Sequence, residues 1–509
     1  MFKSPVFKVT LLATAIVGAI TTPFLSFASD YNPPNVVLIL VDDMGFDLGT
    51  YGHPVNKTPV LDGLANTGQK WNSFYVASGV CSPSRGALLT GRHPVTTGMY
   101  GKNSFVSPEN DPYGFPNTEI SLAKGLQDLG YKTGIVGKWH LGDTEKAIPT
   151  KHGFDYWYGI TMSNDAYKTY TLDLVQSEQA RISGDKEALS ERNRKVKDAN
   201  HNPKEEYWDQ PIYEGYAHTK LRVVQSPAIQ RDLTKNFVTK SMEFITKNKN
   251  NAFFLYVPLT NPHAPLFPGQ GFEGTTDGGP YGDSIAELDY SVGEIVKHLE
   301  KENLRDNTLI IFLSDNGPWL PYQDKAGNNG FFHSSKGSTY EGGVRVPAIF
   351  NWPGQIESKV VYDIGNAMDI YPTVINLAGG ELSKDRDYHG FDITNTLLDG
   401  EKTSRDFNAY YFKGELKAYR KGSYKLHFDT VNFLNPQPYE KNNIRLFNIN
   451  IDTKEQWDIS DKHPEIVADL TKEAKAYDSK IHKAEPMFDR YIFEVIAREE
   501  AAAKVNKTR

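Results

Sequence analysis

Four segments of the chain are apolar runs that end abruptly in polar residues. The first, Asn35–Val41, is a continuous series of aliphatic residues that leads into Asp42 and Asp43. An uninterrupted apolar run of this length predicts a strand buried on both faces, as in a parallel sheet. Three similar runs and the polar residues after them are Gly134–Val136 before 137–140, Phe253–Val257 before 261–265, and Leu309–Leu313 before 314–317.

Helical patterns alternate with these strands. The last of them, Gly282–Leu299, shows apolar residues at helical spacing. This alternation predicts an α/β domain whose mostly parallel sheet is sandwiched by helices. Ligands of such sheets gather beyond the carboxyl ends of the strands, and all four polar stretches fall at that edge. The predicted helices are Thr58–Gly68, Ile120–Leu129, Thr234–Lys247 and Gly282–Leu299.

The pattern changes after residue 381 to short alternating strands, such as Asn408–Phe412 and Ser423–Phe428, followed by a helix from Pro464 to Lys483. We therefore predict a catalytic domain over residues 29–381 and a smaller α+β domain with an antiparallel sheet over 382–509. The last residues, from Arg498, are expected to be frayed.

The stretch 161–230 is polar, aromatic and charged, and it lacks convincing strand periodicity. We interpret it as an insert over the site, where specificity usually resides. A solvated surface excursion is an equal alternative.

The first 28 residues have the layout of a secretory signal peptide: two lysines, the apolar run Val9–Ile20 and a small-x-small site at Ser26–Ala28. An N-terminal anchor is the alternative, but a membrane span needs roughly 20 apolar residues and this run is shorter. No later stretch resembles a span. We therefore expect a secreted or periplasmic protein with no membrane span after signal cleavage.

Composition and charge narrow the classes of function. The 509 residues include 39% hydrophobic and 23% charged residues, which is ordinary for a folded globular protein. The net charge of −7 is modest, and no long run of Lys and Arg occurs outside the short segment 191–197. No nucleic-acid-binding surface is therefore indicated, and a polyanionic substrate would need a local basic site. The oligomeric state is left open.

The single cysteine, Cys81, can make no intramolecular disulfide in an exported chain. A lone cysteine is most often a small buried hydrophobe. Here, however, Pro83 and the residues after it predict a helix that starts just after Cys81. Residue 81 would then face the free backbone donors and the positive end of that helix, which favours a developing anion.

The segment Cys81-Ser-Pro-Ser-Arg85, extended by Leu89-Thr-Gly-Arg92, resembles the Cys-x-Pro-x-Arg signature of type I sulfatases. Over nearly the whole mature chain the resemblance is to the arylsulfatase A and N-acetylgalactosamine-6-sulfatase branch. It implies an alkaline-phosphatase-like fold, sulfuric ester hydrolysis, and oxidation of Cys81 to formylglycine by a maturation enzyme. Phosphatases of that superfamily carry Ser or Thr at this position, so the cysteine favours a sulfatase.

Asp42, Asp43, Asp315 and Asn316 supply hard oxygen atoms from two strand ends, which suit Ca²⁺ or Mg²⁺ better than zinc. Paired acids after a strand are also common as helix caps. Four such groups at one sheet edge favour the metal. The resemblance implies that these positions hold Ca²⁺, with Mg²⁺ less favoured, and that the formylglycine hydrate at residue 81 completes the shell.

Sulfate ester hydrolysis needs cations and hydrogen-bond donors where negative charge develops. The resemblance implies that Arg85 and Lys138 hold the formylglycine diol and the sulfate, and that Lys336 binds sulfate. Ser163 occupies a position where relatives place another sulfate-contacting serine, although relatives often have His where this chain has Asn164.

In the mechanism that the resemblance implies, one hydroxyl of the hydrated aldehyde attacks sulfur in line and displaces the sugar alcohol. His263 or Lys336 protonates the leaving oxygen. His140 then removes the proton of the second hydroxyl, which expels sulfate and restores the aldehyde. A serine or threonine has no second hydroxyl and could not perform this elimination.

The substrate is indicated only by aromatic residues that suit stacking on sugar rings, namely Trp208, Tyr213, Tyr216, Trp319 and Tyr322. They favour a sulfated polysaccharide or its oligosaccharides, with algal galactans such as carrageenan ahead of glycosaminoglycans and of small aryl sulfates. The alternatives are a phosphodiesterase or phosphonate hydrolase of the same superfamily and a non-catalytic binder of sulfated glycans. A complete nucleophile, metal and basic set argues against the binder.

Overall fold

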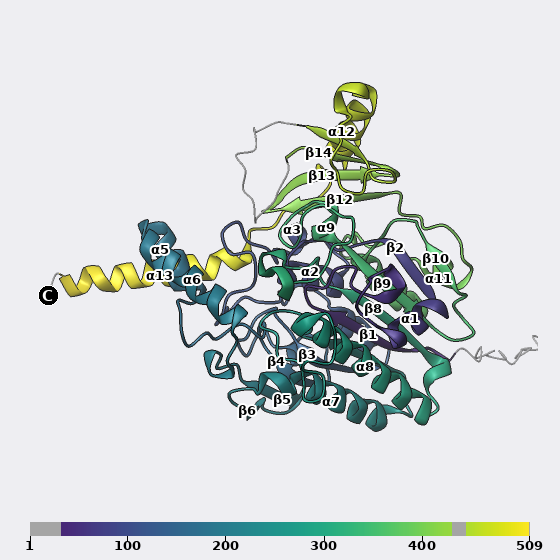
Figure 1. The fold of residues 1–509 in the computed structure, drawn as a ribbon, viewed down its shortest axis with the longest axis horizontal. Coiled ribbons are helices and arrows are strands. Elements are labelled where there is room, and N and C mark those ends of the chain that lie inside the picture. Colours follow the sequence, from purple (N-terminus) through teal and green to yellow (C-terminus); the bar gives the residue numbers. More distant parts are fainter. Residues whose placement is uncertain (1–31, 430–443, 508–509) are drawn as a thin grey trace, which may run out of the picture. The chain divides into compact units, whose positions relative to one another are not determined.

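The computed structural model describes residues 32–429 and 444–507, and residues 33–509 cluster as one compact unit. Strand β1 (Asn35–Val41) lies inside an eleven-stranded sheet and is buried along its whole length. It pairs in parallel with β7 (Phe253–Pro258) on one side and β8 (Thr308–Ser314) on the other. Figure 1 shows β1 and β8 next to each other in the large sheet. The predicted mostly parallel sheet is confirmed.

The strand order of the large sheet is β10-β2-β9-β8-β1-β7-β3-β4-β5-β6, with β11 also paired to β2. Strands β9 and β5 run antiparallel to both of their neighbours. The remaining strands of this sheet are β2 (Gln69–Tyr75), β3 (Lys132–Lys138), β4 (Tyr156–Ile160), β5 (Ile212–Tyr216), β6 (Arg222–Gln225), β9 (Arg345–Asn351), β10 (Lys359–Val361) and β11 (Gly365–Asn366).

Helices cover both faces of this sheet, as expected for a sandwich. Successive residues of β1 point to opposite faces, so Val37 belongs to one hydrophobic core and Leu38 to the other. The first core includes residues of α1 (Pro59–Asn66), α7 (Leu233–Asn248) and α8 (Gly279–Lys301). The second includes residues of α2 (Cys81–Thr90), α4 (Leu122–Asp128) and α10 (Ile370–Leu377).

A separate antiparallel sheet of four strands follows in the C-terminal part, as predicted. Leu470 and Ala474 of α12 (Pro464–Asp478) share one core with this sheet, which explains the apolar spacing of that helix. Its strands are β12 (Phe407–Phe412), β13 (Glu415–Lys421), β14 (Tyr424–His427) and β15 (Arg445–Asn448). The proposed division near residue 382 stays a prediction.

The structure gives regular elements to two segments that the sequence pattern left irregular, while the interpretation of 161–230 as an insert stays a prediction. The stretch 161–230 contains β5 and β6, which extend the edge of the large sheet, and the helices α5 (Leu174–Ser183) and α6 (Lys186–His201). The sequence pattern did not predict β6 because Arg222, Val223 and Val224 are all exposed, so the strand has no buried face that would give alternating apolar positions. The chain after 498 continues the helix α13 (Met487–Lys507), which packs against α5.

The short helices are α3 (Pro94–Thr97), α9 (Glu341–Val344) and α11 (Thr394–Leu398). Among the described residues, no helix is both long and apolar enough to cross a membrane. The predicted signal peptide, residues 1–28, lies outside the described residues.

Candidate active site

The carboxyl ends of β1 and β8 bring Asp42, Asp43 and Asp315 to one edge of the sheet. The backbone N–H of Asp43 donates to Oδ1 of Asp315 at 3.2 Å, and the N–H of Asp315 donates to the carbonyl of Val41 at 3.0 Å. Strands β1 and β8 are parallel neighbours, so their carboxyl ends lie at the same edge of the sheet. The residues that follow the two strands therefore meet there. The structure therefore brings these carboxylates together at the edge where the sequence placed them, and their role as metal ligands stays a prediction.

Two loops are tied together beside the cluster and bring Lys336 to Cys81. The N–H of Gly337 donates to the carbonyl of Gly79 at 2.7 Å. A Cβ at residue 79 would lie 2.7 Å from the carbonyl oxygen of Ser338, so only glycine permits this approach.

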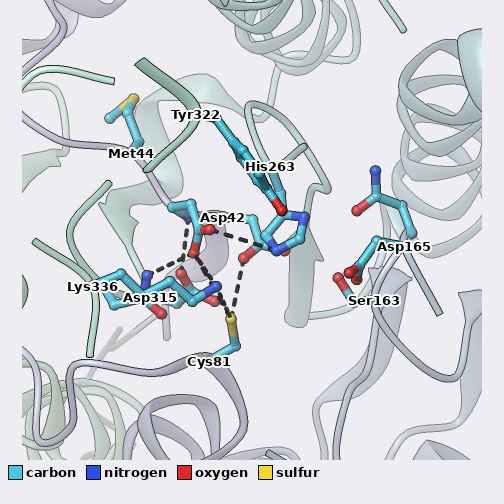
Figure 2. A network of polar contacts seen from close by, with 12 residues as sticks. Asp42, Met44, Cys81, Ser163, Asp165, His263, Asp315, Tyr322 and Lys336 are labelled. Atoms are coloured by element: carbon cyan, nitrogen blue, oxygen red, sulfur yellow. Dashed lines mark hydrogen bonds and ion pairs between the residues drawn. The ribbon is translucent and has the colours of Figure 1, made fainter. Parts of the chain in front are cut away.

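Cys81 is the first residue of α2 and is almost fully buried. Its Sγ lies 3.5 Å from Oδ1 of Asp42, 3.9 Å from Oδ1 of Asp43 and 3.1 Å from Nζ of Lys336. Figure 2 shows the thiol pointing into this group of charges. Burial raises the pKa of the Cys81 thiol, against the effect of Lys138 and Lys336, so the unmodified residue is neutral.

Arg85 lies one helical turn after Cys81 and forms a buried ion pair with Asp315. Its Nε and Nη2 atoms lie 2.8 and 2.7 Å from Oδ2 of Asp315, and Nη2 is also 3.4 Å from Asp42. Burial and the charge of Asp42 raise the pKa of Asp315 to about 6, despite Arg85. This helix therefore delivers both Cys81 and the guanidinium of Arg85 to the cluster.

Lys138, at the end of β3, donates to Oδ2 of Asp42 and to Oγ of Ser163 at 3.1 Å. Burial alone would raise the pKa of Asp42, but Lys138, His263 and Arg85 outweigh it and hold that pKa well below its usual value. Asp42 is therefore ionised although its side chain is fully buried.

His263 and Lys336 approach Asp43 from other loops. Nε2 of His263 is 3.5 Å from Oδ2 of Asp43, and Nζ of Lys336 is 2.6 Å from Oδ1. Burial lowers the pKa of His263, and Asp43 only partly opposes this. Burial also acts against the ammonium form of Lys336, but the carboxylates of Asp43 and Asp42 raise its pKa well above the usual value.

His140 is held by its backbone, whose N–H donates to the carbonyl of Thr161 at 2.8 Å and whose φ of 58° is rare outside glycine. Its ring is buried, and Nδ1 has no hydrogen-bond partner among the described residues. Burial, Lys138 and Arg85 lower its pKa well below the usual value. His140 is therefore a neutral imidazole.

The cluster contains a group of side chains that could hold a metal ion. Ligand atoms of Asp42, Asp43, Cys81 and His263 all lie within 4.8 Å of one another. Oδ1 of Asn316 is buried without a hydrogen-bond partner among the described residues, while its amide nitrogen donates to Asp43 at 2.7 Å. An orphaned amide oxygen beside carboxylates is the ligand chemistry that Ca²⁺ prefers.

Asp165 is a site residue to which the sequence assigned no role. Its carboxylate lies 3.2 Å from Nζ of Lys168, and its side chain stays 29% exposed beside Ser163 (Figure 2). Burial raises the pKa of Asp165, but the positive charges of Lys168, His263 and Lys138 lower it by more. Asp165 is therefore ionised. The only signal in the sequence was its closeness to Ser163.

The aromatic residues proposed for sugar stacking divide into two groups. Trp208 is 1% exposed and cannot present a face to a sugar, whereas Tyr213 is partly exposed and has one face stacked on Trp157. Trp319 lies beside the site, where Nζ of Lys336 is 5.9 Å from its ring centroid. Asn200 of α6 donates to the hydroxyl of Tyr322 at 2.9 Å, so the insert supports this loop.

Comparison with known proteins places this geometry in a family. The family model described as Sulfatase matches residues 34–380, and the model described as the C-terminal region of aryl-sulfatase matches 403–503. N-acetylgalactosamine-6-sulfatase of Sus scrofa is 38% identical over 408 residues, which cover 78% of this chain and 72% of that protein. Arylsulfatase A of Bos taurus is 36% identical over 409 residues, which cover 78% and 75%.

Solved structures give the same assignment. The PsFucS1 sulfatase from Pseudoalteromonas sp. has a TM-score of 0.75 at 28% identity and covers 90% of this chain and 93% of its own. Ps i-CgsB, solved in complex with k-i-k-neocarrahexaose, has a TM-score of 0.68 at 29% identity and covers 89% and 94%. This chain belongs to the sulfatase family and is a sulfuric ester hydrolase.

Proposed function

We propose that this sulfatase is exported and removes sulfate from a carbohydrate, with a formylglycine derived from Cys81 and with Ca²⁺ as cofactor. The observation that carries the proposal is the convergence of Arg85, Lys138 and Lys336 on the carboxylates around Sγ of residue 81. Burying so many charges costs free energy of folding, and such clusters are typical of functional sites. Three cations at one place suit chemistry on an anion.

Asp42, Asp43, Asp315 and Asn316 would hold the cation, which supplies a fixed positive charge near residue 81. Formylglycine supplies a hydrated aldehyde, a carbon that carries two hydroxyl groups. Oxidation of residue 81 removes the sulfur atom that Lys336 contacts, which leaves that ammonium group free to bind an oxygen atom in its place.

The remaining residues bind the sulfate and move protons. The ammonium groups of Lys138 and Lys336 pair with Asp42 and Asp43, the two carboxylates that Sγ of residue 81 contacts, where they can hold the oxygens of a sulfate. His263 lies at the same carboxylates and, with Lys336, is placed to protonate the leaving oxygen. The neutral ring of His140 can accept a proton from residue 81.

We propose a sulfated polysaccharide or its oligosaccharides as substrate, with carrageenan-type galactans as the first to test. Support comes from Ps i-CgsB, which was solved with a neocarrahexaose, and from relatives whose name contains N-acetylgalactosamine-6-sulfatase. The partly exposed ring of Trp319 beside Lys336 offers a face for a sugar next to the sulfate position. Glycosaminoglycans and aryl sulfates are the alternatives within the same chemistry.

The test is a desulfation screen of protein coexpressed with a maturation enzyme. Sulfated galactan and glycosaminoglycan oligosaccharides, an aryl sulfate and an aryl phosphate serve as substrates, and released anions are measured by ion chromatography. We expect sulfate release from at least one oligosaccharide and none from protein made without maturation. Release of phosphate alone would contradict the proposal and favour a phosphoester or phosphonate hydrolase. Binding without turnover by fully matured protein would favour the glycan binder.

A further inference from the structure

A cavity of about 870 Å³ opens near the loops that follow β1 and precede α9. Three aromatic rings that line the cavity contact one another. The ring centroid of Phe46 lies 5.1 Å from that of Tyr51 and 4.8 Å from that of Phe332. The guanidinium of Arg345 lies 4.5 Å from the centroid of Phe332. A cavity of this size holds a ligand of several rings.

The rim of this cavity carries the most exposed large hydrophobic side chains of the described residues. Phe331 is 76% exposed and Tyr362 is 71% exposed, and both line the cavity. Ile451, at 80%, follows the lining residue Asn450. Exposed apolar side chains that gather at a cavity mark a binding surface, whereas singly scattered ones need no explanation.

The polar groups of the cavity can form hydrogen bonds but present no free positive charge. Asn72, Asn328 and Asn450 line the cavity. Oδ1 of Asn328 accepts from the N–H of Gly330 at 2.6 Å, and Nδ2 of Asn450 donates to Oγ of Ser423 at 2.8 Å. Nη1 of Arg345 is paired with Glu341 at 3.1 Å, and its Nε donates to the carbonyl of Asn72 at 2.6 Å. Burial lowers the pKa of His53, which is therefore neutral. This lining suits an uncharged ligand with hydroxyl groups.

The cavity shares its loops with the active site. Phe46 lies on the loop that begins with Asp43, and Phe332 lies on the loop that continues to Lys336. The N–H of Phe46 donates to the carbonyl of Asn328 at 2.9 Å, which ties the two loops together. A ligand in the cavity would therefore contact both loops without contacting the groups around residue 81.

We propose that this cavity binds an uncharged stretch of a polymeric carbohydrate, remote from the sulfate ester that is hydrolysed. Aromatic faces stack on the apolar faces of pyranose rings, and side-chain amides bind sugar hydroxyls. The inference rests on the proposed function, because it supplies a second holding point for the same polysaccharide. It makes the enzyme more efficient on polymer than on small esters.

The test uses Tyr362→Ala and Phe331→Ala, whose exposed side chains can be removed without opening the core. Tyr290→Ala, which is 51% exposed on α8, is the matched control. Kinetics are measured on an aryl sulfate and on sulfated galactan, and mobility is measured in gels that contain galactan chemically stripped of sulfate. We expect aryl sulfate turnover to be unchanged in all three variants. KM for polymer should rise about fivefold to tenfold in the cavity variants alone, as expected when one aromatic contact is lost. Their retardation in the gel should disappear.

Equal KM values for polymer and equal retardation of the cavity variants and the unsubstituted protein would overturn the inference. So would a change of sedimentation from dimer to monomer with unaltered polymer kinetics, because the patch would then be a contact between copies of the chain. The desulfated gel separates this inference from the proposed function. It reports binding even if no carbohydrate is desulfated, whereas absence of sulfate release by the unsubstituted protein contradicts only the proposed function.

Discussion

The ammonium group of Lys336 bridges Cys81 and Asp43, with Nζ 3.1 Å from Sγ of the cysteine and 2.6 Å from Oδ1 of the aspartate. The ammonium group of Lys336 therefore neutralises Asp43, a proposed metal ligand, and contacts residue 81, the proposed nucleophile. A charge held at this point by a 2.7 Å backbone bond between Gly337 and Gly79 needs no rearrangement when negative charge develops.

Replacement of Lys336 by Met should lower kcat on an aryl sulfate by about 10²- to 10³-fold, the range found when a preorganised donor is removed. The hydrophobic stem is kept, so folding should be preserved. Conversion of residue 81, read by mass spectrometry in the same sample, controls for failed maturation. A kcat within a few-fold of the unsubstituted enzyme at equal conversion would refute this role.

Removal of the proposed Ca²⁺ should abolish activity and lower the thermal unfolding midpoint. The carboxylates of Asp42, Asp43 and Asp315 would then lose the positive charge of the metal ion. Metal content is measured by mass spectrometry after exhaustive chelation. Readdition of Ca²⁺ should restore both properties more completely than Mg²⁺, since the oxygen set is large and irregular. A metal-free protein with full activity would be inconsistent with the proposed site.

Lys425 is fully buried between Glu341 and Glu455, with Nζ 3.0 Å from a carboxylate oxygen of each. Lys425→Met removes the one counter-charge that these two buried carboxylates share, although Glu341 keeps its pair with Arg345, and should reduce the free energy of unfolding by about 3 kcal/mol. The control is Lys421→Met, which breaks a solvent-exposed pair with Glu473 and should cost less than about 1 kcal/mol. Urea denaturation measures both, and equal losses would show that burial of the first pair is unimportant.

Glu287 should make stability fall as pH rises. Burial raises its pKa from 4.5 to about 7 in the folded protein, despite hydrogen bonds from Gly269 and Asn261. Below pH 4.5 the carboxyl is protonated in both states and costs nothing. As pH rises toward 7 only the unfolded chain ionises, so the folded state loses up to about 3 kcal/mol relative to the unfolded chain.

A Glu287→Gln variant keeps the acceptor of both hydrogen bonds and cannot ionise. Its excess in free energy of unfolding over the unsubstituted protein should therefore grow between about pH 4 and pH 8. Glu294→Gln on the same helix removes a partly exposed carboxylate and is the control. A difference for Glu287→Gln that is independent of pH would contradict the assignment.

The local sequence pattern predicted the location of those site residues whose geometry follows from strand direction. Asp42, Asp43 and Asp315 follow apolar runs, and parallel pairing of β1 and β8 necessarily brings them together. The pattern failed where tertiary context decides. Trp208 looked available to a sugar but is buried, and β6 joins the sheet with an exposed surface. The cavity combines Phe46, Phe331 and Tyr362, which no local pattern relates.

Mass spectrometry of the peptide that contains residue 81, taken from enzyme with measured sulfatase activity, tests the central claim most directly. The account predicts an aldehyde or its hydrate at that residue, and activity in proportion to the fraction converted. An unmodified thiol at residue 81 in fully active enzyme would contradict it.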